Sequence, residues 1–322
     1  MTILVVRLGA MGDILHALPA VASLKQGFPK AELTWVVESR WTPLLEQNPF
    51  VDRILPLHRG SIAGLLESWR ELRDRRFDLA VDFQGLLKSA LVASAARVDR
   101  ILGFHRSQIR ERWAALFYSR EVSSAAAHVV ERNLDLAAAA GAGCAVRVFP
   151  VPPGNPEGDL PAGDFVLASP LAGWPSKQWP LEHYRRLAIA LRRDHGLPLV
   201  LNGPPSSAGT LANAPEAIPH LSGLAGLIHA TRRAVAVVGV DSGPMHLAAA
   251  LGKPGVAVFG PTSPERNGPY GGSLTVLRAP SAETTYKRVP EIHSAMWEID
   301  PARVLAELLA ALDRHRSREH RG

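Results

Sequence analysis

The stretch "GVDSGPMHLAAALGKPGVAVFGPT", residues 239–262, has the pattern of a strand, a short helix and a second strand. Asp241 stands where a buried strand should stop, and a glycine turn leads into an Ala/Leu-rich helix that contains His246. A second apolar run follows at 255–262. Two strands joined by a crossover helix are typical of a parallel sheet. The turn at Asp241 raises the question of whether this unit is purely structural or binds an anion.

The same alternation extends outward through the chain. Apolar, β-branched runs predict further strands at residues 3–8, 32–38, 51–57, 77–83, 100–104, 165–170, 197–203 and 234–240. Most are separated by segments with helical periodicity, residues 204–233 are rich in loop-forming residues, and a last helix is expected at 301–322 with a charged tail. Alternating strands and helices predict parallel sheets covered on both faces.

A change in composition divides the chain. Segment 149–164, "FPVPPGNPEGDLPAGD", is dense in Pro and Gly and is the expected linker. A length of 322 residues suits two domains of ordinary size. We therefore expect an α/β protein with two Rossmann-like, doubly wound domains, residues 1–155 and 156–322, and a cleft between them.

Charge and cysteine content restrict partners and compartment. The chain has 36 Lys and Arg against 30 Asp and Glu, a net charge of +6, which favours nucleotides, phosphorylated sugars, nucleic acid or an acidic membrane. The single cysteine, Cys144, excludes an intrachain disulfide and a cysteine-based metal site, and it fits a reducing cytoplasm. Since no apolar run approaches the roughly 20 residues that cross a bilayer, any membrane contact should be peripheral.

The first of three strand-to-helix turns is "RLGAMGDILHALPA", residues 7–20. Ligands bind at such turns in parallel sheets. Gly9 and Gly12 form only G-x-x-G, so the dinucleotide fingerprint is incomplete. Asp13 is either a helix N-cap or a general base at a strand end.

The second turn is "SPLAGWPSKQWPLEHYRRLA", residues 169–188. A small-residue turn at Ala172 and Gly173 leads to Lys177, which lies between Trp174 and Trp179. Lys177 is either a solvated surface cation or a point charge beside a phosphate.

The third turn is the opening stretch itself. Either Asp241 or Ser242 can cap the helix, Gly243 allows close approach, and the helix N-terminus favours an anion. Asp241 would repel a phosphate and more readily accepts hydrogen bonds from sugar hydroxyls. His246 is either a buried, hydrogen-bonded histidine or a donor to a phosphate oxygen.

In combination and order, these turns resemble the heptosyltransferases of glycosyltransferase family 9. The resemblance covers nearly the whole chain and includes "VVE" (36–38), "VDFQGLLKSAL" (81–91) and "LFYSR" (116–120). It implies a GT-B fold with the acceptor site in the first domain and the nucleotide-sugar site in the second, and a last helix that can cross back onto the first domain. It further implies inverting, metal-independent transfer of L-glycero-D-manno-heptose from ADP-heptose to a Kdo residue of the lipid A inner core, in lipopolysaccharide core biosynthesis.

The family roles transfer residue by residue. Asp13 matches the catalytic base. The residues that match the donor site are Ala172, Gly173, Lys177, Asp241, Ser242, Gly243 and His246. The residues that match or adjoin the anionic acceptor site are Gly12, Lys88, Arg106, Arg110, His128 and Arg132. No cofactor or metal is implied, and the enzyme is expected in the cytoplasm, peripherally on the anionic inner membrane.

Several alternatives remain open. The chain could use another nucleotide sugar or add a later heptose, and the residue that contacts the nucleoside is not identified, with Glu216 the nearest candidate. A Rossmann oxidoreductase would use Glu38 to bind a ribose, although the missing third glycine argues against it. A nucleic-acid-binding protein is suggested only by the pI of about 9.8, and no nucleic-acid-binding module supports it.

Overall fold

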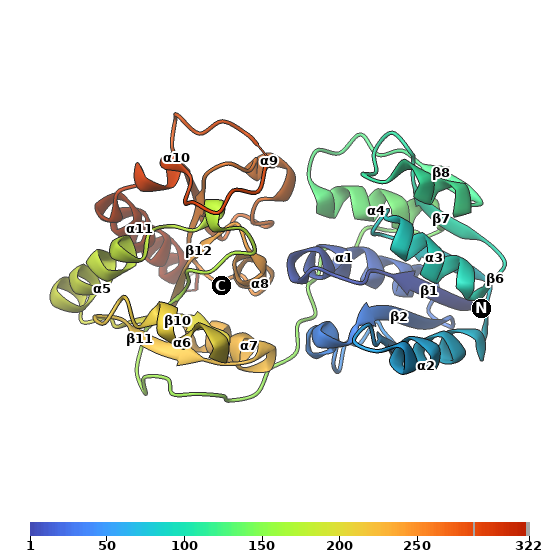
Figure 1. The fold of residues 1–322 in the computed structure, drawn as a ribbon, viewed down its shortest axis with the longest axis horizontal. Helices are drawn as coiled ribbons and strands as arrows, with labels where there is room; N and C mark the ends of the chain where they lie inside the picture. The colour runs from blue at the N-terminus through green and yellow to red at the C-terminus, as the bar shows by residue number, and fades with distance from the viewer. Residues whose placement is uncertain (286, 320–322) are drawn as a thin grey trace. The chain divides into compact units, whose positions relative to one another are not determined.

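The computed structural model describes residues 1–285 and 287–319. The chain divides into two compact units, Met1–Pro152 (unit 1) and Pro153–Gly322 (unit 2), and the division falls inside the Pro/Gly-rich segment 149–164. Figure 1 shows unit 1 in blue to green and unit 2 in yellow-green to red, each with helices flanking its own sheet.

Unit 1 contains a six-stranded parallel sheet in the order β3-β2-β1-β5-β7-β8. Its strands are β1 Thr2–Val6, β2 Glu32–Glu38, β3 Arg53–Leu57, β5 Leu79–Asp82, β7 Ile101–Phe104 and β8 Arg120–Val122. A separate small pair is formed by β4 Arg76–Phe77 and β6 Arg97–Val98. The helices are α1 Met11–Gly27, α2 Ile62–Arg73, α3 Leu87–Ala95 and α4 Val129–Ala139, with 3₁₀ helices at Ser39–Leu44 and Arg112–Phe117.

Unit 2 repeats this plan with a six-stranded parallel sheet in the order β11-β10-β9-β12-β13-β14. Its strands are β9 Val166–Ser169, β10 Leu199–Gly203, β11 Ile218–Leu221, β12 Ala236–Val240, β13 Gly255–Phe259 and β14 Leu274–Arg278. The helices are α5 Leu181–His195, α6 Ala208–Leu211, α7 Leu224–Arg233, α8 Gly243–Ala250, α9 Pro264–Asn267, α10 Ser294–Trp297 and α11 Pro301–Glu319, with 3₁₀ helices at Pro175–Lys177 and Pro205–Ser207.

The two sheets share one strand order: counted along the chain within each unit, it is third, second, first, fourth, fifth, sixth. This is the doubly wound Rossmann arrangement, so the predicted fold class is confirmed. The direction of winding reverses between β1 and β5 in unit 1 and between β9 and β12 in unit 2. Ligands in such sheets bind beyond the carboxyl ends of the strands at this reversal.

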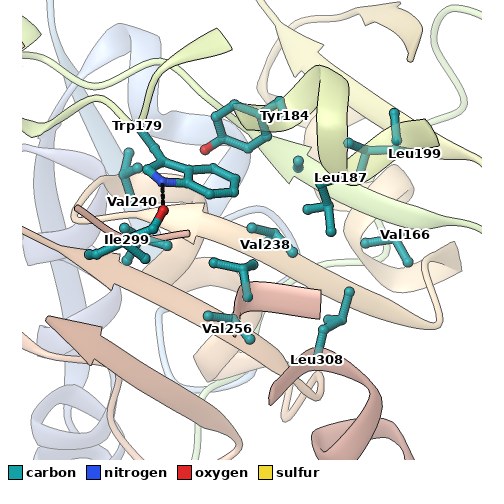
Figure 2. Close-up of a cluster of buried hydrophobic side chains, with 14 of the residues drawn as sticks. Val166, Trp179, Tyr184, Leu187, Leu199, Val238, Val240, Val256, Ile299 and Leu308 are labelled. Carbon is teal, nitrogen blue, oxygen red and sulfur yellow. Dashed lines mark hydrogen bonds between the residues drawn. The ribbon is translucent and has the colours of Figure 1, made fainter. Parts of the chain in front are cut away.

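The core of unit 2 anchors one of the predicted turns. Trp179 is buried, its indole N–H donates to the Ile299 carbonyl at 3.0 Å, and its ring packs edge-to-face on Tyr184 at 4.8 Å (Figure 2). A buried indole normally has a partner for its N–H. Because Lys177 precedes Trp179 by two residues, this contact fixes the position of the lysine's backbone.

The last helix packs within unit 2. Helix α11 contacts α5 and strands β12 to β14, and it buries Val304, Leu308 and Leu312 at helical spacing. The sequence predicted a helix to residue 322, and residues 320–322 lie outside the described part. That this helix crosses onto unit 1 stays a prediction. No described helix is both long and apolar enough to cross a membrane.

Residues 204–233, read from the sequence as loop-rich, contain β11, α6 and α7. Strand β11 has the sequence Ile-Pro-His-Leu. Because it contains Pro219 and His220, it lacks the apolar run from which a strand is predicted. It lies at the edge of the sheet, where it pairs with β10 in parallel. The loop interpretation was wrong because an edge strand is specified by its pairing rather than by an apolar run.

Candidate active site

Asp13 lies just beyond β1, in the first turn of α1. Its Oδ1 is 2.7 Å from Nη2 of Arg7, and its Oδ2 accepts a hydrogen bond from the Ala10 N–H at 3.2 Å. The Arg7 side chain is buried and also donates to the Phe83 carbonyl at 2.5 Å, whereas the Asp13 side chain is 45% exposed. A buried guanidinium therefore holds a solvent-accessible carboxylate at the reversal between β1 and β5. The N-cap residue is Ala10, so the N-cap alternative for Asp13 was wrong.

Glu38 ends β2 and gathers three cations. Its buried carboxylate is 2.7 Å from Nη1 of Arg59, 2.9 Å from Nη2 of Arg40 and 3.4 Å from Nζ of Lys88. Burial alone would raise the pKa of Glu38, but the hydrogen bond from Arg59 and the charges of Lys88 and Arg40 together lower it. Lys88, expected to bind the acceptor, is therefore oriented by Glu38 in a cluster that keeps an excess of positive charge.

Helix α4 brings a second set of predicted residues to α1. His128 is the N-cap of α4, and its Nδ1 accepts from the Val130 N–H at 3.1 Å. Its ring lies edge-to-face against His16, with centroids 5.6 Å apart, and His16 follows Asp13 by one turn of α1. Arg132, one turn along α4, extends over the Phe104 ring at 5.7 Å. His128 thus lies close to the turn that carries Gly12 and Asp13.

Arg106 and Arg110 lie in the loop between β7 and the 3₁₀ helix Arg112–Phe117. Glu121 of β8 accepts from the Arg106 N–H at 2.8 Å and from Nε at 3.1 Å, with a further contact from Nη2. The side-chain and backbone hydrogen bonds from Arg106 lower the pKa of Glu121 to about 2. Arg110 is exposed in the same loop. To bind an anionic acceptor, Arg106 would have to release Glu121 or pair with Glu121 and the acceptor together.

In unit 2, Asp241 is the centre of a buried polar cluster. It follows β12, and its Oδ2 accepts from Nζ of Lys177 and from Oγ1 of Thr262, both at 2.7 Å. Lys177 Nζ also donates to the Asp241 carbonyl at 3.2 Å. Lys177 follows β9 and Asp241 follows β12, which are neighbours at the reversal of the sheet. Two of the predicted donor-site turns therefore meet side chain to side chain.

The N-terminus of α8 completes this cluster. Ser242 is the N-cap residue by backbone conformation, but its hydroxyl makes no capping hydrogen bond and is one of the buried polar atoms without a partner among the described residues. The Asp241 carboxylate is held by Lys177 and Thr262, and Nε2 of the buried His246 lies 3.8 Å from Oδ1 of Asp241. Neither Asp241 nor Ser242 therefore caps α8 with its side chain. The helix dipole at this N-terminus favours an anion.

The turn after β9 surrounds Trp174 with cations. Lys177 Nζ lies 4.6 Å from the centroid of the Trp174 ring, and the Arg288 guanidinium lies 4.9 Å from it. The preceding Gly173 is exposed, and a side chain added there would meet open space. Its neighbour Ala172 is half-buried. The turn thus presents backbone groups and two cations close together, as binding of a phosphate requires.

Sequence analysis missed Arg7, Thr262 and Arg288. Arg7 follows β1 and Thr262 follows β13, so the only available signal was their position just beyond the carboxyl ends of strands. Arg288 lies in an irregular segment between β14 and α10, where no periodicity could place it beside Trp174. Glu216, the candidate nucleoside contact, accepts from Nε of Arg185 at 2.7 Å.

Chemically, unit 1 offers an accessible carboxylate bordered by cations, and unit 2 offers a lysine, an arginine and a helix N-terminus. The first can accept a proton, and the second can bind an anionic leaving group. Within residues 1–285 and 287–319, no three Cys, His, Asp or Glu side chains gather as a metal site would require.

Comparison with known proteins identifies close similarity to one family. A family model described as glycosyltransferase family 9 (heptosyltransferase) matches residues 65–294. Lipopolysaccharide heptosyltransferase 1 of Escherichia coli K12 is 32% identical over 310 residues, covering 87% of this chain and 94% of the relative. The Pseudomonas aeruginosa protein of that name is 33% identical over 304 residues, covering 86% and 83%. The solved E. coli heptosyltransferase WaaC with ADP has a TM-score of 0.78 at 28% identity, covering 97% of this chain and all of WaaC.

Proposed function

The chain belongs to glycosyltransferase family 9, and we propose that it transfers L-glycero-D-manno-heptose from ADP-heptose to a Kdo residue of the lipid A inner core. Its two doubly wound units are the GT-B fold expected of that family. The observation that carries the proposal is the Lys177–Asp241–Thr262 cluster beside the N-terminus of α8, in a chain similar to a heptosyltransferase solved with ADP.

The proposed donor site binds the diphosphate through positive charge. Lys177 and the N-terminus of α8 stabilise the phosphate oxygens, and the backbone N–H groups of Ala172 and Gly173 supply hydrogen bonds where the turn is open. Asp241 orients Lys177 and accepts from hydroxyls of the donor sugar. His246, together with Ser242 and Gly243, completes the helix end that faces the phosphates.

The proposed transfer needs no divalent metal, because Lys177 and the helix end neutralise the charge that develops on departing ADP. Chelation by EDTA should therefore leave the rate unchanged. A rate that falls with EDTA and returns with added Mg²⁺ would contradict this part of the proposal.

The proposed acceptor site lies in unit 1. Asp13 removes the proton from the acceptor hydroxyl, the acceptor oxygen forms a bond to the anomeric carbon, and the bond from that carbon to ADP breaks with inversion. Gly12 precedes Asp13 in the same turn, and His128 contacts His16, one turn further along α1. The carboxylates and phosphates of the acceptor pair with cations of Lys88, Arg106, Arg110 and Arg132. The enzyme works at the anionic cytoplasmic face of the inner membrane, where this acceptor is anchored.

The test is Asp13→Asn with purified enzyme, ADP-heptose and the Kdo-lipid A acceptor. Loss of a general base should lower kcat by roughly 10²–10⁴-fold, while ADP binding measured by calorimetry stays unchanged. Asp52→Asn is the matched control, because Asp52 is a carboxylate of unit 1 that is also ion-paired, 2.7 Å from Lys25. Near-normal turnover by Asp13→Asn would refute the role of Asp13.

A panel of substrates tests the remaining specificity. Transfer from another nucleotide sugar, or to an acceptor that already carries heptose, in preference to ADP-heptose and Kdo, would move the chain to another role within the family. The oxidoreductase alternative is wrong, because the chain is a family 9 glycosyltransferase. Its expected ribose ligand, Glu38, instead holds Arg40, Arg59 and Lys88.

A further inference from the structure

One face of unit 1 exposes an unusual number of large apolar side chains. We call it the apolar face and define it by Ile62, Leu65, Leu66 and Trp69 of α2, Leu91 of α3, and Trp113 of the following 3₁₀ helix. Helix α3 contacts both α2 and that 3₁₀ helix, and the residues of α2 and Leu91 of α3 line one groove. Contiguous exposed apolar surface of this kind marks an interaction site.

Helix α2 leaves most of its apolar stripe uncovered. Ile62, Leu65, Leu66 and Trp69 follow the spacing of one helix face, yet Ile62 is 80% exposed and Trp69 47% exposed. The inward contacts of α2 are made by Leu72, which is buried in the core, and by Ser68, whose buried hydroxyl donates to the Pro56 carbonyl at 3.1 Å. An ordinary surface helix buries its apolar stripe. The uncovered part of the stripe indicates that α2 has a partner outside the fold.

The space between α2 and α3 is a groove of about 450 Å³. Its lining is apolar apart from Ser68 and includes Val36 of β2, Leu55 of β3 and Val92 of α3. The groove continues the stripe of α2 down to the sheet. The apolar face is therefore broad, and it is indented between α2 and α3. Such a surface suits a fluid apolar partner rather than a small polar ligand.

Cations border the apolar face. The Arg73 guanidinium lies 5.0 Å from the centroid of the Trp69 ring, and exposed Arg70 and Arg112 lie next to Trp69 and Trp113 in the sequence. Residues 59–76 carry five arginines against three acidic residues. Tryptophan and arginine together are favoured where protein meets the boundary between lipid headgroups and acyl chains, and anionic lipids attract the cations.

We propose that the apolar face docks unit 1 onto an anionic lipid bilayer, with α2 lying in the plane of the interface. The inference rests on the proposed function in one respect: α3, which supplies Leu91, also carries Lys88 of the proposed acceptor site, and that acceptor is anchored in a bilayer by lipid A. Docking through α2 and α3 would hold this site next to the membrane that contains its substrate.

The experiment compares the full-length protein with its Leu66→Glu, Trp69→Glu double variant on vesicles of phosphatidylethanolamine and phosphatidylglycerol. Removing the two apolar anchors should weaken vesicle binding, measured by cosedimentation, by about tenfold or more. Transfer to Kdo-lipid A embedded in the vesicles should fall with it, whereas transfer to a deacylated, water-soluble acceptor should stay unchanged. Ile189→Glu is the control, because Ile189 is an exposed apolar residue on α5 of unit 2.

Each other outcome is decisive. Vesicle binding equal to that of the unsubstituted protein would overturn the proposal, and so would a dimer that the double variant dissociates while vesicle binding persists. If the unsubstituted protein transfers heptose to neither acceptor, the proposed function fails, and cosedimentation still decides the docking surface. Should the double variant melt early by circular dichroism, Leu66→Gln with Trp69→Gln repeats the comparison with a milder change.

Discussion

At the scale of single residues, Asp241 combines a structural role with its proposed binding role. Its carboxylate is buried and accepts from Lys177 and Thr262. A buried charge is tolerated when it is paired and hydrogen-bonded. Sequence analysis identified Asp241 and Lys177 as separate candidates but could not predict that they bind each other, because 64 residues separate them. Their contact arises from the adjacency of β9 and β12.

The Lys177–Asp241 pair can be tested by a double-mutant cycle. Lys177→Met leaves a buried carboxylate without its cation and should lower the free energy of unfolding by about 3–5 kcal/mol. Adding Asp241→Asn removes the unpaired charge and should restore much of that stability without restoring ADP binding. Urea unfolding and calorimetry measure the two effects. A single variant as stable as the parent would show that the pair contributes little to the fold.

At the scale of elements, position in the sheet explains which segments the sequence could predict. Central strands such as β1 and β12 are buried on both faces, so they are apolar throughout and easily recognised. Strands β8 and β11 lie at the sheet edges and carry polar residues, including Glu121 and His220. Short edge strands do not need an apolar run, which is why the sequence did not predict them. The Arg106–Glu121 ion pair joins β8 to the loop that follows β7.

That ion pair predicts a pH dependence. The pKa of Glu121 is lowered to about 2 in the folded chain from an ordinary 4.5, chiefly by the hydrogen bond from Arg106. A carboxyl whose pKa is lowered by folding stabilises the fold above its unfolded pKa. The contribution is therefore present above pH 4.5 and is lost as the pH falls toward 2. In Arg106→Gln, NMR titration should find the Glu121 pKa raised but still below 4.5, because the backbone N–H of residue 106 still donates to the carboxylate, whereas Arg110→Gln should leave it unchanged.

At the scale of the whole molecule, the chain builds one topology twice. Both sheets reverse their winding beside the first strand of the unit. Each predicted site includes residues that follow the strands at this reversal. Each unit also has its own core: unit 1 buries Leu4, Val6 and Val36 around its sheet, and unit 2 buries Val166, Val238 and Val256 around its own. Because the cores are separate, a ligand of one unit should stabilise that unit first.

Hydrogen exchange with ADP tests this assignment of the donor to unit 2. At an ADP concentration about 100 times its Kd, the ligand should stabilise the binding unit by ~2.7 kcal/mol. We expect slower amide exchange in the turn from Ala172 to Lys177 and at the start of α8, with no change in the turn around Gly12 and Asp13. Protection confined to the turn in unit 1 would place the nucleotide there and contradict the donor assignment.

The sequence by itself determined the two doubly wound units and the turns that carry Asp13, Lys177 and Asp241, because apolar periodicity and glycine turns are local properties of the chain. The tertiary structure decided which side chains meet. It brought Lys177 and Thr262 to one carboxylate oxygen of Asp241, paired Arg7 with Asp13, and left most of the apolar stripe of α2 uncovered. Such pairings depend on strand order and helix orientation, which join residues far apart in the sequence.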